Sequence, residues 1–490
     1  MTLRPQPGRP ANSEKATRFR SEHPCCLQYP GPSQHPLTTA RSVCTKDQKL
    51  VTVTLAPAEK CRCGFPQAEH SRSVVPYDCT TAGQKSSFFG QISDCSPSCI
   101  GTTGCSTQRQ IGPPVALTTC PRKHTLNHDA TDSPACLAET ISLSSRTDLF
   151  EILDNHRICE LSRLNKSTSK SSSGFPNAAA VLRSTGVSSR RILRIGVQPL
   201  DLAVALENTL DQQNLGRFSD FHAVLLCHSH TDPAAVLQLA DNLRQHAAPL
   251  TRLPDIQTFN AGCTGFLQQL QQARHMLQNT AADTRILLLN IETPESWHCA
   301  ADRAFCGIVG AAATATIIKK QGGRPITWLQ INHTQVPDSH LLQPGPLFHT
   351  EFTRTISFRG QTQHRCVMRM HGEAVFVHGI ELMLQAVRQA HQNTSATTPI
   401  TSPPVTLIPH QPSGKLLRAF TAALQSELPH INVLSNLQHS GNTISATIPE
   451  LLASHPTLHN APSSPLILAA SGICMPQMHN CMSFGSAYLA

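Results

Sequence analysis

The chain has 490 residues and a formal net charge of +9, with only 14% of its residues charged and 4% aromatic. This length is sufficient for two or three domains with a sizeable buried core. A mild positive charge without a basic and aromatic stripe does not favour nucleic-acid binding. No apolar run approaches the roughly eighteen residues that a membrane span requires. The first residues, MTLRPQPGRP, lack the apolar region of a signal peptide but are rich in arginine, which leaves a transit peptide open. We expect a cytoplasmic protein without a membrane span.

Residues 1–136 differ in composition from the rest of the chain. They hold 11 of the 19 cysteines and many turn-forming residues, with almost no apolar periodicity. Their cysteine spacings include Cys61-x-Cys63 but no pair of Cys-x2-Cys knuckles, which argues against a zinc site. We expect a poorly ordered extension of unknown role, and the sequence leaves open whether it belongs to the native protein.

From residue 137 onward, apolar residues recur with the periods of helices and strands. Helices are predicted over 200–210 and 266–277, and buried strands over 221–227, 285–292, 307–318, 405–410 and 466–471. Strands that alternate with helices predict an α/β fold.

One strand ends in LLCHSHTDP, residues 225–233, which raises the possibility of a metal site. Alternate strand positions would place His228 and His230 on one face with Asp232 just beyond, as in several zinc hydrolases. Those hydrolases have a further histidine and glycines next, whereas Pro233 and two alanines follow here. We therefore expect no metal at this turn.

Three polar residues stand at the ends of predicted strands or before helices. Cys263 in NAGCTGF lies at a helix N-terminus, where backbone amides lower a thiol pKa, although a lone cysteine is more often a small buried apolar group. His410 ends a buried strand, and Asn442 precedes an amphipathic helix that it could simply cap. Together they form a Cys, His, Asn set.

The segments around these residues resemble the 3-oxoacyl-ACP synthase III family of the thiolase superfamily. NAGCTGF is similar to the nucleophile segment of that family, IPHQ to its histidine segment, and SGNTISATIP to its asparagine segment. Weaker similarities include RSTGVSSRRI, and the resemblance extends from about Ile141 to Ala490. It implies a thiolase-like five-layer αβαβα fold with two halves related by a pseudo-twofold axis, 137–326 with the cysteine and 327–490 with the histidine and asparagine.

The resemblance also implies a chemistry. Cys263 would carry the acyl group, while His410 and Asn442 would stabilise the enolate formed when a malonyl-type thioester loses carbon dioxide. The backbone N–H of Cys263, with one near Gly472, would bind the acyl oxyanion. Neither a cofactor nor a metal is expected. A non-decarboxylating acyltransferase and a catalytically silent paralogue acting as a subunit are the alternatives.

The partners implied are acyl-CoA or acyl carrier protein thioesters and malonyl-ACP. The early element lacks the tryptophan that stacks on coenzyme A in the family, which favours a carrier protein, and Lys415 and Arg418 would bind its acidic surface. A homodimer, or a heterodimer with a paralogue, would pair through an edge strand at 255–262. The loop SGICMPQMHNCMSFGSA is longer than in the family, which suggests a specialised fatty-acid or polyketide-like substrate.

Overall fold

The structure is a computed structural model that describes residues 135–164, 175–247, 254–297, 307–336, 347–356, 362–395, 404–460, 464–475 and 480–490. Every described residue belongs to a single compact unit. Residues 1–134 of the predicted poorly ordered extension, 1–136, lie outside the described residues. Cys136 belongs to the first strand, so the ordered fold begins slightly earlier than expected.

Two groups of five strands make up the main sheet. The first group is β1 (Cys136–Ser142), β4 (Ala223–Cys227), β5 (Asp255–Phe259), β6 (Arg285–Glu292) and β7 (Ala312–Lys319). Their order is β5-β4-β6-β7-β1, with β4 parallel to β5 and β6, and with β7 antiparallel to both β6 and β1.

The second group repeats this topology strand for strand. It comprises β8 (Arg324–Gln335), β11 (Val405–Pro409), β12 (Ile431–Val433), β13 (Leu466–Ile473) and β14 (Cys481–Leu489). The order is β12-β11-β13-β14-β8, with the same sequence of parallel and antiparallel pairs. A short pairing of β1 with β8 joins the groups. The predicted boundary after residue 326 falls just inside β8.

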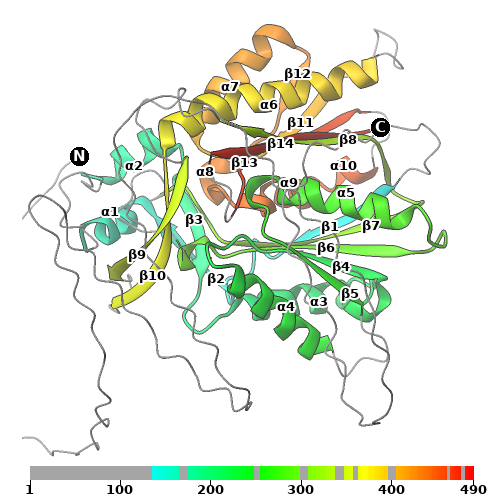
Figure 1. Cartoon of the computed structure of the whole chain (residues 1–490), viewed down its shortest axis with the longest axis horizontal. Helices are drawn as coiled ribbons and strands as arrows, with labels where there is room; N and C mark the ends of the chain where they lie inside the picture. The colour runs from blue at the N-terminus through cyan, green and yellow to red at the C-terminus, as the bar shows by residue number, and fades with distance from the viewer. Residues whose placement is uncertain are drawn as a thin grey trace, which may run out of the picture. The chain divides into compact units, whose positions relative to one another are not determined.

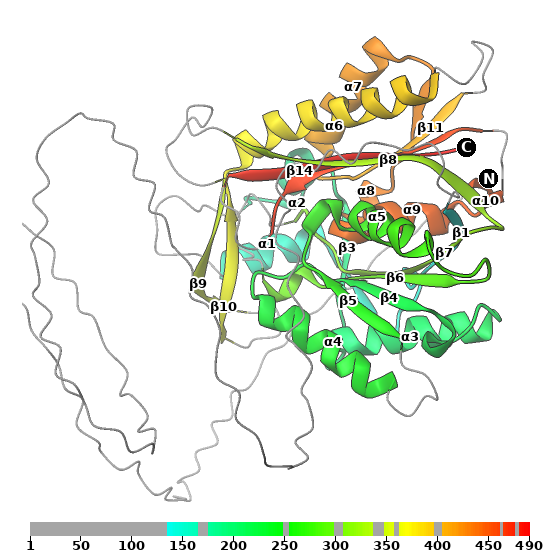
Figure 2. The same ribbon diagram turned by 45° about the vertical axis from the view of Figure 1, so that its right-hand side comes forward.

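Helices separate and cover the two groups of strands, giving the expected five layers (Figure 1). The helices α3 (Pro199–Gln212) and α4 (Pro233–Ala247) cover the first group, whereas α6 (Gly372–Ser395) and α7 (Gly414–Glu427) cover the second. Between the groups lie α5 (Gly265–Leu277) and α9 (Thr447–Ser454) (Figure 2). The thiolase-like α/β fold is thus confirmed.

The remaining elements lie at the margins of these layers. They are β2 (Phe150–Asp154), α1 (Asn155–Leu164), α2 (Ala178–Thr185), β3 (Ser189–Leu193), β9 (Phe348–Ile356), β10 (Thr362–Met370), α8 (Leu437–Ser440), α10 (Thr457–Asn460) and short 3₁₀ turns at Phe218–Asp220, Gly262–Thr264, Pro294–Ser296 and Ile444–Ala446. Among the described residues, no helix is long and apolar enough to cross a membrane.

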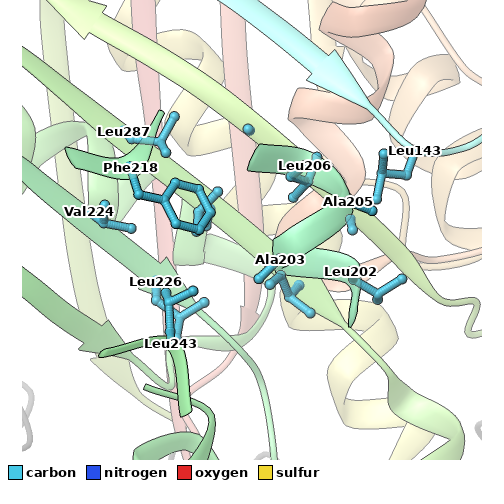
Figure 3. Close-up of a cluster of buried hydrophobic side chains, with 14 of the residues drawn as sticks. Leu143, Leu202, Ala203, Ala205, Leu206, Phe218, Val224, Leu226, Leu243 and Leu287 are labelled. Atoms are coloured by element: carbon cyan, nitrogen blue, oxygen red, sulfur yellow. The ribbon is translucent and has the colours of Figure 1, made fainter. Parts of the chain in front are cut away.

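Alternating apolar residues explain how each strand serves two layers. In β4, Val224 and Leu226 face α3 and α4, where they meet Leu202, Leu206 and Leu243 (Figure 3). Leu225 faces the central helices instead, because successive side chains of a strand point to opposite faces. Burial on both faces accounts for the nearly continuous apolar sequence of this strand.

One predicted strand begins later than expected. The segment from Gly307 was predicted to be extended throughout, but β7 begins only at Ala312. Gly307 has a φ of 82°, and the N–H of Gly310 donates to the Asn442 carbonyl at 3.0 Å. The chain there pairs with a loop of the second half instead of with β6.

Candidate active site

Cys263 lies in a tight turn between β5 and the central helix α5. The turn is the 3₁₀ segment Gly262–Thr264, in which Gly262 has a φ of 57°. A Cβ at Gly262 would lie 3.2 Å from the Ile473 carbonyl oxygen, and one at Gly265 would lie 2.4 Å from the Cys227 sulfur. Gly262 therefore permits the close approach of the Cys263 turn to the second half, and Gly265 permits the close approach of the start of α5 to β4.

His410 follows β11 and is completely buried. Its backbone N–H donates to the Ala469 carbonyl at 2.7 Å, which fixes the end of the strand. Neither ring nitrogen makes a well-formed hydrogen bond within the described part of the chain, although the Ile444 backbone lies near enough to the ring to raise its pKa slightly. Desolvation lowers the pKa of His410 to about 3, so the ring is neutral near pH 7 and retains one N–H donor.

Asn442 follows Gly441, whose φ is 70°. Two hydrogen bonds fix the backbone of Asn442. Its N–H donates to the Ile308 carbonyl at 2.8 Å, and its own carbonyl accepts from Gly310. The side-chain Oδ1 accepts the N–H of Ile444 at 2.8 Å, which identifies the oxygen because a backbone amide only donates. The Nδ2 group makes a long 3.4 Å contact with the Pro412 carbonyl and keeps a second proton to donate.

These three residues line one pocket, although they come from both halves of the fold. Gly472, the predicted neighbour of the oxyanion site, also lines it and packs against Cys263: a Cβ at this position would lie only 2.6 Å from the Cys263 Cβ. The rest of the wall is mainly apolar and comprises Trp297, Ile308, Val309, Met368, Met370, Val375, Gly379, Pro412, Leu416, Ile444, Ser471, Ile473, Met475 and Met482 together with Gly262. Lys415 and Arg418 are exposed on α7 and do not line the pocket.

The expected lowering of the Cys263 pKa is wrong. Burial, followed by the nearby Glu292 carboxylate, raises the pKa of the Cys263 thiol to about 12. The helix N-terminus does not compensate, because removal of the sulfur from water disfavours the thiolate more than the backbone amides stabilise it. A thiol with this pKa is protonated near pH 7.

Glu292 is a buried residue that the sequence analysis did not single out. It ends β6 and accepts hydrogen bonds from the Ser229 N–H and hydroxyl and from the Ser445 hydroxyl, which tie the two halves together. Desolvation outweighs these bonds and raises its pKa to about 7. A carboxylate at the end of a buried apolar strand such as RILLLNIE is rare, and this pattern could have singled out Glu292 from the sequence.

Gln411 is a second residue whose place only the structure shows. Its side-chain oxygen accepts from the backbone N–H groups of Asn436 and Leu437 and from the Ser435 hydroxyl. It thereby fixes the loop that leads to Asn442 beside the strand that ends in His410.

The LLCHSHTDP turn has local hydrogen-bonding roles. The Nδ1 of His228 donates to the Ile291 carbonyl at 2.6 Å, and the Asp232 carboxylate accepts from the Ala234 N–H at the start of α4. His228 and His230 line a separate cavity, beside α3 and α4.

Comparison with known proteins shows which family the chain is similar to. A sequence profile for 3-oxoacyl-[acyl-carrier-protein] synthase III matches residues 258–334, which include Cys263. Proteins named beta-ketoacyl-[acyl-carrier-protein] synthase III are similar in sequence: that of Ruegeria is 26% identical over 195 residues, 39% of this chain and 56% of that relative. That of Oleidesulfovibrio alaskensis is 28% identical over 280 residues, 55% of this chain and 79% of the relative.

The fold comparison agrees. A crystal structure of 3-oxoacyl-(acyl carrier protein) synthase III from Pseudomonas aeruginosa has a TM-score of 0.52 at 21% identity, covering 73% of this chain and 98% of that one. In sequence and in fold, the chain is therefore similar to the 3-oxoacyl-ACP synthase III family. The chain spans about half the length of the first curated relatives that it matches, 56% of each.

Proposed function

We propose that this chain is a member of the 3-oxoacyl-ACP synthase III family and an acyltransferase that condenses an acyl thioester with a malonyl-type thioester. The observation that carries the proposal is the convergence of Cys263, His410 and Asn442 on one mainly apolar pocket. Such a pocket supplies a nucleophile and two neutral hydrogen-bond donors while excluding water.

The first half-reaction is the transfer of the acyl group to Cys263. The sulfur attacks the thioester carbonyl, the bond to the departing sulfur breaks, and the proton of the Cys263 thiol ends on the released thiol. The backbone N–H of Cys263 and one near Gly472 are the proposed donors to the tetrahedral oxyanion. Because the thiol is protonated at rest, substrate binding must assist proton removal.

The second half-reaction uses His410 and Asn442. The malonyl group loses carbon dioxide, and the electron pair of the broken bond forms an enolate whose oxygen accepts from the ring N–H and from Nδ2. The nucleophilic carbon then attacks the acyl group on Cys263 and expels the sulfur, which takes up a proton. A neutral histidine and an amide suit this role, because they stabilise an oxyanion without forming a fixed ion pair.

We further propose that the donors are carried by an acyl carrier protein that binds near Lys415 and Arg418, although acyl-CoA is a possible primer. The exposure of both cations on the first turns of α7 supports this. A homodimer, or a heterodimer with a paralogue, is proposed through β5, which is the outermost strand of its group. A cytoplasmic location is in keeping with Cys159, Cys227 and Cys263, none of which forms a disulfide.

The experiment separates the two half-reactions. The full chain is incubated with short, long and aromatic acyl thioesters and analysed by intact mass, while malonyl decarboxylation is followed independently. Cys263→Ser should abolish the acyl adduct, whereas Asn442→Asp should retain it and lose decarboxylation. Loss of acylation in Asn442→Asp with decarboxylation intact would show that the roles are wrongly assigned.

A catalytically silent subunit is the second candidate. The raised pKa of Cys263 and a cavity volume of about 70 Å³, room for only a few water-sized groups, favour it. The absence of an acyl adduct with every donor class would support this alternative. Acylation without condensation would instead support a non-decarboxylating acyltransferase.

A further inference from the structure

Three neighbouring strands bring two cysteines and a histidine together near the loop that joins β13 to β14. Cys474 follows β13, Cys481 begins β14, and the Cys474 N–H donates to the Cys481 carbonyl at 3.0 Å. On the other side, Cys481 pairs with Gln335 of β8, and His333 pairs with Ser483. Cys481 and His333 are therefore diagonal neighbours on one face, within reach of an imidazole.

The ligand atoms of these residues converge. The two sulfurs are 2.9 Å apart, and the Cys474 sulfur is 3.7 Å from Nδ1 of His333. All three atoms lie within 4.8 Å of one another, and both cysteines are buried, with exposures of 6% and 1%. Among the described residues this is the one group of three or more such side chains with metal-ligand geometry.

The spacing suits a shared metal ion. Zinc bonds of about 2.3 Å to sulfur and about 2.0 Å to nitrogen place tetrahedral ligand atoms roughly 3.5–3.8 Å apart. The Cys474 to His333 distance of 3.7 Å matches that range. The sulfur pair, at 2.9 Å, would have to open by roughly 0.6–0.9 Å to reach it. A disulfide requires about 2.05 Å between the sulfurs and gives no role to the histidine.

We propose that Cys474, Cys481 and His333 bind a thiophilic divalent cation of the zinc class. Two thiolates and an imidazole are the donor set that such ions prefer, and binding releases the thiol protons to solvent. Three protein ligands leave the fourth position for water or another ligand.

The site is coupled to the candidate active site through β13 and β14. Gly472, two residues before Cys474, packs against Cys263, and Ile473 and Met482 line the pocket. A metal that fixes the ends of these strands would hold this wall of the pocket in place. This consequence rests on the proposed function, whereas metal binding itself does not.

The test measures bound metal in the full chain. Residues 1–136 hold 11 of the 19 cysteines and could bind metal themselves, so each variant is compared with the unmodified full chain. Apo protein is prepared with a chelator and a reductant, titrated with Zn²⁺ against a chromophoric chelator, and reconstituted in parallel with Co²⁺. The site variants are the double change Cys474→Ala/Cys481→Ala and the single change His333→Gln. Cys136→Ala, which removes a buried cysteine of β1, is the matched control.

We expect the double variant to bind one equivalent of Zn²⁺ less than the unmodified chain and the control, and to lose part of the Co²⁺–thiolate absorption. His333→Gln keeps both cysteines and should weaken this equivalent by at least about tenfold. If the double variant does not fold, the His333→Gln titration still decides the question.

Alkylation followed by peptide mapping adds a readout that does not depend on acyl transfer. Cys474 and Cys481 should be protected in the Zn²⁺-loaded chain and become modified after chelation. Equal Zn²⁺ stoichiometry and affinity in all proteins would overturn the proposal. So would a mass lower by two hydrogens that maps to a Cys474–Cys481 disulfide in protein purified without reductant and free of metal.

Discussion

The two halves of the fold share a backbone plan but use it for different chemistry. Leu225 of β4 pairs with Leu288, and Ile408 of β11 pairs with Leu468, and all four side chains face the central helices. Two residues further along, Cys227 and His410 therefore occupy corresponding places. In the same way, the 3₁₀ turn Gly262–Thr264 leads into α5 and the 3₁₀ turn Ile444–Ala446 leads into α9. Asn442 lies two residues before the second of these turns.

The two corresponding residues, Cys227 and His410, differ in their surroundings and in their hydrogen bonds. Cys227 lies beneath Gly265 and is fully buried, and near it Gln269 donates to the carbonyls of Leu225 and Leu289. His410 in the second half faces the pocket, and neither ring nitrogen makes a well-formed hydrogen bond, although the Ile444 backbone lies near the ring. A buried donor whose hydrogen bond is poorly formed costs free energy unless a ligand improves it. This difference between the halves supports the proposed role of His410 as a donor to a substrate oxygen.

The largest expected effect tests this difference directly. His410→Ala should reduce the rate of condensation by about 10²–10³-fold, because one oxyanion donor is lost, while acylation of Cys263 continues. Cys227→Ala, at the corresponding place, should leave the ratio of the two half-reactions unchanged. Single-turnover measurements of each step provide the comparison. An equal loss of condensation in both variants would show that the halves do not differ as described.

Glu292→Gln tests the hydrogen bonds between the halves through the pH dependence of the free energy of unfolding. The folded-state pKa of Glu292 is raised from 4.5 to about 7, so the folded protein binds the proton more tightly than the unfolded chain. Stability from this group is present below pH 4.5 and is lost as pH rises toward 7, by about 3 kcal/mol at most. Urea unfolding from pH 4.5 to 8 should show this decline. The decline should be much smaller in Glu292→Gln, and an unchanged profile would contradict the assignment.

Removal of the same charge should also affect Cys263. The ionised Glu292 carboxylate contributes to the raised thiol pKa. Near pH 8, Cys263 in the Glu292→Gln variant should therefore react faster with iodoacetamide than in the unmodified chain. The effect should be partial, because burial remains the larger cause.

Gly472→Ala tests the contact between the second group of strands and the nucleophile turn. The new methyl group would lie 2.6 Å from the Cys263 Cβ and 2.9 Å from its sulfur. We expect a loss of about 1–3 kcal/mol of stability from overpacking, with slower acylation. Gly322→Ala, where nothing lies within 4 Å but φ is 74°, controls for backbone strain alone. Equal acylation rates for the two variants would show that the contact does not constrain Cys263.

The smallest expected effect concerns the exposed cations of α7. Lys415→Glu with Arg418→Glu should raise the KM for an acyl carrier protein substrate by roughly tenfold or less and weaken its salt dependence. Acyl-CoA kinetics should change little. Unchanged carrier kinetics would mean that the two side chains are simply solvated.

The local elements could be predicted because they depend on neighbours in the sequence. The strand over 285–292 was predicted with the bounds it has, and the helix α5 with the stripe of Phe266 and Leu270 that packs on the central core. The predicted start of β7 was wrong because Gly310 hydrogen-bonds to Asn442, more than a hundred residues later in the chain.

The sequence by itself predicted the α/β alternation of strands and helices, and the segments that resemble a known family predicted Cys263, His410, Asn442 and Gly472 as site residues; all four line one pocket. Only the tertiary structure decided the charge states. The pKa values of Cys263, Glu292 and His410 follow from burial and from groups contributed by distant segments. It also brought His333 beside Cys474, 141 residues away, through strand pairing that no local spacing reveals. Desolvation and long-range contacts arise only when the two halves pack together.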